Sequence, residues 1–258
     1  MSYPKKTLKE RLAPTGQKKL LALDGGGIRG LMSIEVLAAI ENTLRDKLGA
    51  GDDFVLADYF DYVAGTSTGA IMATGISLGW PVDKLRQLYL QNGEALFSKA
   101  SLLKRFRFMY EDDKLARMLQ EYIGKDTTLA SDELRTLLMV VMRNASTDSP
   151  WPLSSNPAAK YNDLSRPDSN LRIPLWQLVR ASTAAPVYFP PEVVDVGKHQ
   201  FVFVDGGVTT YNDPAFILFL MATLEPYKLG WPSGEENMLV VSVGTGTSPK
   251  ANEDLEPD

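Results

Sequence analysis

Residues 58–70 have the sequence DYFDYVAGTSTGA, in which an apolar run leads into Ser67 between two glycines. The run predicts a buried strand over residues 58–64. Residues 67–78 predict a helix with many small side chains, which allow a helix to lie close to a sheet. A Gly-x-Ser-x-Gly turn between strand and helix is the pattern of the nucleophile elbow, which exposes a catalytic serine above a sheet. The same pentapeptide also serves as a plain turn whose glycines allow close packing.

Outward from this turn, short apolar runs alternate with segments of helical periodicity. We expect strands over residues 19–23, 134–142, 201–204 and 238–243, and helices over residues 31–48, 115–123 and 176–185 and after Pro81. This alternation predicts an α/β fold, with a central, mostly parallel sheet and helices on both faces. Residues 144–171 are polar and rich in proline, so we expect a long loop there.

The chain shows no internal repeat and no clear domain boundary, so we expect one domain over residues 1–258. Within it, we expect a flexible N-terminal segment at residues 1–18 and an acidic tail at residues 247–258.

The composition excludes several kinds of site. The 258 residues include no cysteine and one histidine, which excludes disulfides, thiolate metal sites, a cysteine nucleophile and a His-rich zinc site. The formal net charge of −5 gives no reason to expect nucleic acid as a partner. The first 19 residues lack the apolar core of a signal peptide, and no uncharged apolar run reaches membrane-spanning length. We therefore expect a cytoplasmic protein.

The single histidine limits what could activate Ser67. His199 precedes the apolar run at residues 201–204, which ends at Asp205. Six residues of extended chain separate His199 from Asp205, about 20 Å at the rise of a strand. The two side chains therefore lie at opposite ends of one strand, and a Ser67–Asp205 dyad is a simpler prediction than a Ser-His-Asp triad. An aspartate is a weak base unless burial raises its pKa, so this site should be largely apolar. Without Ser67, the Asp-Gly pair at residues 205–206 would be read as an ordinary turn.

A glycine-rich loop follows the first predicted strand, with the sequence DGGGIRG at residues 24–30. Its glycines let backbone N–H groups converge on an anion, so Gly25, Gly26 and Gly27 are candidates for an oxyanion hole. The loop also fits the dinucleotide-binding fingerprint, but the next strand ends in the serine turn rather than in a ribose-binding acid. Arg29 is a candidate for capping, for pairing with Asp24, or for contact with a lipid phosphate.

Four motifs in this order resemble the patatin-like phospholipase family: DGGGIRG at residues 24–30, GTSTG at 65–69, ASTAAPVYFP at 181–190 and DGGV at 205–208. The resemblance spans residues 20–246. It implies a patatin-like fold and hydrolysis of lipid acyl esters without a metal or an organic cofactor. It also implies Ser67 as nucleophile, Asp205 as base, and Gly25 to Gly27 as the oxyanion hole. Two other hypotheses stay open, namely a non-catalytic lipid-binding protein and a dinucleotide-binding oxidoreductase.

Two further segments have both a functional and a structural interpretation. Residues 99–110 interleave basic and apolar side chains, which suits a lid or a surface meeting anionic lipid, or a helix or loop that packs inward. Residues 176–190 suit either an acyl pocket or the core. The expected partners are a lipid substrate and, through peripheral contact, a membrane. The sequence does not indicate an oligomeric state.

Overall fold

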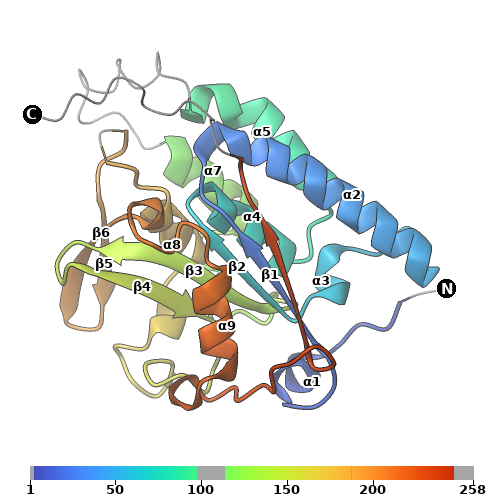
Figure 1. The fold of residues 1–258 in the computed structure, drawn as a ribbon. Coiled ribbons are helices and arrows are strands. Elements are labelled where there is room, and N and C mark those ends of the chain that lie inside the picture. The colour runs from blue at the N-terminus through green and yellow to red at the C-terminus, as the bar shows by residue number, and fades with distance from the viewer. Residues whose placement is uncertain (1–2, 98–113, 187, 247–258) are drawn as a thin grey trace, which may run out of the picture.

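The computed structural model describes residues 3–97, 114–186 and 188–246, and Figure 1 shows their arrangement. Seven strands form one sheet. They are β1 Lys18–Leu23, β2 Tyr62–Thr66, β3 Leu137–Asn144, β4 Ser149–Ser154, β5 Glu192–Val196, β6 His199–Asp205 and β7 Met238–Val243. The α-helices are α1 Leu8–Leu12, α2 Gly30–Leu48, α3 Leu56–Tyr59, α4 Thr68–Ser77, α5 Val82–Phe97, α7 Lys114–Ile123, α8 Leu175–Ser182 and α9 Ala215–Thr223. Four single 3-10 turns, η1 Gly27–Arg29, η2 Asn170–Arg172, η3 Gly206–Val208 and η4 Glu225–Tyr227, complete the described elements.

The sheet is mixed. β7, β1, β2 and β3 lie side by side in parallel, each pair formed by segments distant in sequence. β4 and β6 both pair with β3 in antiparallel register, and β5 pairs with β6. The predicted α/β sheet is therefore confirmed, with its parallel half around β1 and an antiparallel half beyond β3.

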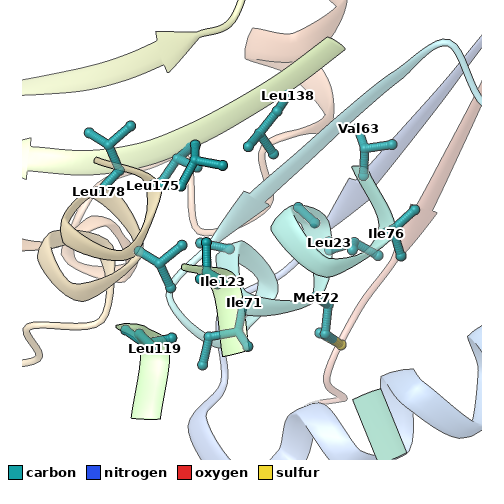
Figure 2. Packing of buried hydrophobic residues seen from close by; sticks show 14 of the residues in the cluster. Leu23, Val63, Ile71, Met72, Ile76, Leu119, Ile123, Leu138, Leu175 and Leu178 are labelled. Carbon is teal, nitrogen blue, oxygen red and sulfur yellow. The ribbon is translucent and has the colours of Figure 1, made fainter. Parts of the chain in front are cut away.

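Two apolar cores lie on the two faces of this sheet, because successive strand residues point to opposite sides. Leu21 and Leu23 of β1 belong to one core, which α2, α4, α5, α7 and α8 cover. Figure 2 shows its packing, with Leu23 of the sheet near α4 and Leu178 of α8 beneath β3. Leu20 and Ala22 point to the other core, which α9 covers (Figure 1). Helices on both faces were predicted and are confirmed.

The expected long loop over residues 144–171 is wrong in its first part, where β4 pairs with β3. Pro150 lies opposite Arg143 and Pro152 opposite Val141. β4 is an edge strand, and an edge tolerates proline because only alternate N–H groups point toward the neighbouring strand.

The expected strand over residues 58–64 begins later, at Tyr62. Asp58 instead caps the start of α3. Its carboxylate accepts a hydrogen bond from the Val55 N–H at 3.0 Å and pairs with Arg135. Side-chain capping of this kind stabilises a helical turn over extended chain.

The N-terminal segment, for which we expect a flexible chain over residues 1–18, carries the helix α1 in its described part. Thr7 and Glu10 form a capping box at the start of α1. Arg11 is 1% exposed, donates hydrogen bonds to the carbonyls of Phe60 and Ala57, and pairs with Asp61. A buried arginine with these partners fixes the segment against the sheet.

Residues 99–110 and the acidic tail at 247–258 lie outside the described residues. Within the described part of the chain, no helix combines the length and the apolar character needed to cross a membrane.

Candidate active site

The glycine loop and the serine turn meet where two parallel strands end. Leu23, the last residue of β1, pairs with Gly65 of β2. The backbone of the turn is tightly packed there: a Cβ on Gly65 would lie 2.1 Å from the Gly69 carbonyl oxygen, and one on Gly69 would lie 2.1 Å from that of Leu23. Both glycines of the Gly-x-Ser-x-Gly pattern are thus required by close backbone approach.

Ser67 itself has a strained backbone, with φ 55° and ψ −122°. A non-glycine residue adopts positive φ at a cost, and such strain is concentrated at functional sites. The strained turn ends at the first residue of α4, so the serine lies at the positive end of a helix. The nucleophile-elbow geometry predicted from the sequence is present.

β3 places the serine and the aspartate side by side. Thr66 pairs with Val141 in parallel register, and Asp205 pairs with Met142 in antiparallel register. The residue after Thr66 therefore lies next to the end of β6. The Ser67 hydroxyl donates a hydrogen bond to Oδ2 of Asp205 at 2.6 Å.

Asp205 is 5% exposed, and burial raises the pKa of its carboxyl group. Hydrogen bonds from Ser67 and from the Gly207 N–H, at 2.6 Å to Oδ1, oppose that rise without cancelling it. Burial favours the neutral acid, so the ionised form is a stronger base than an exposed aspartate. This agrees with the apolar environment expected for such a base.

Ser182 is a site residue that the sequence reasoning did not single out. Its hydroxyl accepts a hydrogen bond from the Ser67 N–H at 2.8 Å and donates one to the Val141 carbonyl at 2.5 Å. Ser182 is fully buried at the end of α8 and so ties the strained turn to β3. Its place in the 181–190 motif was the available signal.

The glycine loop lines the same cavity as Asp205. Of the three predicted oxyanion donors, the Gly25 N–H is engaged in this conformation, because it donates to the Asn212 carbonyl at 3.1 Å. The N–H groups of Gly26 and Gly27 have no hydrogen-bond partner within the described part of the chain. Gly27 has φ +58°, a left-handed conformation that favours glycine.

Thr245 supports this loop from behind. It is 4% exposed, and its hydroxyl donates to the Gly25 carbonyl at 2.9 Å. The Asn212 side-chain amide reaches the same carbonyl at 3.4 Å. Arg29 donates to the Gly246 carbonyl at 3.1 Å and also lines the pocket.

A cavity of about 460 Å³ connects these groups. Gly26, Gly27, Arg29, Ser67 and Asp205 all line it. Its apolar wall comes from the segment after α8 and from the two glycine-rich turns, through Ala185, Tyr188, Phe189, Ile28 and Val208. The last residues of the 176–190 segment thus line this cavity. The helix α8 before them instead contributes Leu175 and Leu178 to the core.

His199 begins β6, and Asp205 ends it. The histidine is exposed and lies beside Phe201, with 6.2 Å between ring centroids. The structure therefore separates it from Ser67, as the sequence predicted. No group of three or more potential metal ligands occurs among the described residues.

Comparison with known proteins places these features in a family. The sequence profile described as patatin-like phospholipase matches residues 21–219. A cGAMP-activated phospholipase from Vibrio cholerae is 32% identical over 215 residues, which cover 78% of this chain and 56% of that protein. An intracellular phospholipase A2 from Caenorhabditis elegans is 32% identical over 238 residues, covering 89% of this chain and 20% of that protein. Patatin-2-Kuras 1 from Solanum tuberosum is 28% identical over 246 residues, covering 89% and 62%.

This chain spans less than two thirds of the length of each of these relatives. The family profile, by contrast, covers most of this chain, and its range contains the glycine loop, the elbow and Asp205. The chain therefore belongs to the patatin-like phospholipase family.

Proposed function

We propose that this chain is a lipid acyl hydrolase of the phospholipase A type that cleaves fatty-acyl esters with a Ser67–Asp205 dyad. The observation that carries the proposal is the 2.6 Å hydrogen bond from the serine hydroxyl to a buried carboxylate. The bond is formed at a strained elbow, and Gly26 and Gly27 line the same cavity as the serine and the aspartate. Nucleophile, base and oxyanion donors are the three parts that acyl transfer requires.

In this mechanism the Ser67 oxygen attacks the ester carbonyl carbon while its proton passes to Oδ2 of Asp205. The negative charge that develops on the carbonyl oxygen is stabilised by the N–H groups of Gly26 and Gly27 and by the N-terminus of α4. Asp205 then gives the proton to the leaving alcohol, which leaves an acyl-serine. A water molecule, deprotonated by the same carboxylate, hydrolyses the acyl-enzyme and restores both groups.

We further propose that the protein meets its lipid substrate at a membrane surface. Exposed apolar side chains surround the cavity mouth: Ile28 is 46% exposed, Tyr188 46% and Val208 46%. Met32 and Val36 continue from Ile28 at four-residue spacing along α2 and are also exposed. Such a stripe beside an active site suits insertion among lipid headgroups, where Arg29 would approach a phosphate.

The test compares Ser67→Ala, Asp205→Asn and the parent protein on phospholipid vesicles and on a soluble p-nitrophenyl ester. Both variants should lose at least about 1,000-fold in kcat, which is the scale for removing a nucleophile or its base. A fluorophosphonate probe should label only the parent, because labelling requires an activated serine. Activity near the parent level in Ser67→Ala would refute the mechanism.

The same samples distinguish the two remaining hypotheses. A non-catalytic lipid-binding protein would bind vesicles without hydrolysis or labelling. A dinucleotide-binding oxidoreductase would bind NAD(H) with measurable heat in calorimetry, in the parent and in Ser67→Ala alike.

A further inference from the structure

A second and larger cavity, of about 610 Å³, lies outside the active site. It is bounded by β4, β6, the chain after β4 and the end of α9, through Trp151, Leu153, Phe201, Ala159, Met221 and Tyr227. No residue lines both this cavity and the active-site cavity. Phe201 precedes Asp205 by four residues of β6, which separates the two along the strand by about 13 Å.

The wall of this cavity is apolar and well supported. The Trp151 ring of β4 packs on two rings of β6. Its centroid lies 4.9 Å from that of Phe201 and 5.3 Å from that of Phe203. Aromatic pairs at these distances stabilise one another beyond the area they bury. The cavity volume lies within the range of about 300–1,000 Å³ that is typical of small-molecule sites.

The buried polar side chains around the cavity already have partners within the chain. The Asn162 amide donates to the carbonyls of Ser154 and Asn156 at 2.7 Å and 2.6 Å. The Ser154 hydroxyl accepts a hydrogen bond from Tyr62 at 2.6 Å. A ligand rich in donors and acceptors, such as a nucleobase, would therefore gain few hydrogen bonds from Asn162 and Ser154. The interior therefore suits a hydrocarbon chain.

The mouth of the cavity carries positive charge. Lys160 is exposed there, with its ammonium 5.1 Å from the ring centroid of Tyr161. The neighbouring carboxylate of Asp168 is held by the guanidinium of Arg166 through two hydrogen bonds, at 2.9 Å and 2.7 Å. The charge of Asp168 is thus neutralised by Arg166, and Lys160 can attract an anionic group of a ligand.

We propose that this cavity binds a long-chain fatty acid, with the hydrocarbon chain against Trp151 and the carboxylate near Lys160. The apolar wall, the engaged polar groups and the cationic mouth all fit a single-chain anionic amphiphile. The site is separate from the dyad, so binding does not depend on the catalytic role of Ser67.

The experiment uses Ser67→Ala protein and bromine-labelled stearate below its micelle concentration. Bromine quenches tryptophan fluorescence on contact, so bound ligand should quench Trp151, and Trp151→Phe should lose that component of the quenching. Ala159→Phe fills the cavity and should weaken binding about tenfold or more, the effect of losing roughly two buried methylene groups. Ala158→Phe is the matched control: it adds the same side chain at the preceding residue, which is exposed and does not line the cavity.

Lys160→Glu, on an exposed side chain, tests the charge without risk to the fold. It should weaken binding of stearate more than binding of the corresponding fatty alcohol. Equal affinities in Ala159→Phe and Ala158→Phe would overturn the site. An unchanged preference for acid over alcohol in Lys160→Glu would overturn the carboxylate contact, and Trp151 quenching by a nucleotide instead of the fatty acid would overturn the ligand class.

Discussion

The substitution Gly26→Ala tests whether backbone N–H groups of the glycine loop stabilise the oxyanion. The new Cβ would lie 2.2 Å from Oγ1, 2.6 Å from Cβ and 2.7 Å from Cγ2 of Thr245. Thr245 is buried and bonded to the Gly25 carbonyl, so the loop must yield, by about 1 Å to restore carbon–carbon contact near 3.5 Å. A donor displaced by that distance no longer makes a hydrogen bond.

Loss of one oxyanion donor costs about 2.7–4 kcal/mol, so kcat should fall about 100- to 1,000-fold. KM should change little, because the oxyanion exists only in the transition state. The assay is steady-state hydrolysis of a p-nitrophenyl ester, with circular dichroism to establish that the variant folds.

The double variant Gly26→Ala/Thr245→Gly provides the control, because it removes all three clashing atoms. It should recover most of the kcat lost in Gly26→Ala, when compared with Thr245→Gly alone in a double-mutant cycle. A folded Gly26→Ala protein with parental kcat would refute the assignment of this loop. The assignment would also be refuted if the double variant showed the same loss in kcat as Gly26→Ala. The loss would then have a cause other than displacement of the loop by Thr245.

Four further predictions concern single groups. His199→Ala should keep kcat on the soluble ester within about twofold of the parent, since a lost general base costs 100-fold or more; a fall of that size would restore the triad. Because burial raises the pKa of Asp205, kcat/KM should fall as pH decreases through a pKa above the ordinary aspartate value; a pH profile flat down to that value would contradict the base role. Ser182→Ala removes the hydrogen-bond partner of the Ser67 N–H and the bond that Ser182 donates to the Val141 carbonyl, so it should lower the free energy of unfolding by about 1–3 kcal/mol in urea, together with kcat; unchanged values would show that the turn is held by other contacts. Burial and the neighbouring Asp213 raise the pKa of Asp24 from 3.8 to about 6, so the folded protein loses stability as pH rises between these values. The melting temperature of Asp24→Asn, relative to that of the parent, should therefore increase from pH 4 to pH 7. A difference that stays constant over this range would exclude the titration of Asp24 as its cause.

The parallel half of the fold could be predicted from the sequence because its strands are continuous apolar runs. β7 has the expected bounds, and α2 begins one residue before the predicted helix. The edge strand β4 could not be predicted in this way, since Pro150 and Pro152 argue against a strand unless it lies at an edge. That position depends on the register with β3, which local sequence does not encode.

The candidate site likewise contains residues that local sequence predicts and contacts that it does not. Ser67 and Asp205 could be predicted because each follows an apolar strand at a turn with its own chemical signature. The hydrogen bond that engages the Gly25 N–H depends on the Asn212 carbonyl, 187 residues away in sequence. The support from Ser182 likewise depends on how α8 meets β3. Contacts of this kind arise only when distant segments pack together.

The pairing of both β2 and β6 with β3 has a consequence for biosynthesis. The ribosome completes Ser67 long before Asp205, and β6 can pair with β3 only after both strands have left the exit tunnel. A nascent chain that ends before β6 therefore carries a nucleophile without its base. Under the proposed mechanism, hydrolytic activity should therefore arise late in translation, and unfinished or prematurely terminated chains should be inactive on acyl esters.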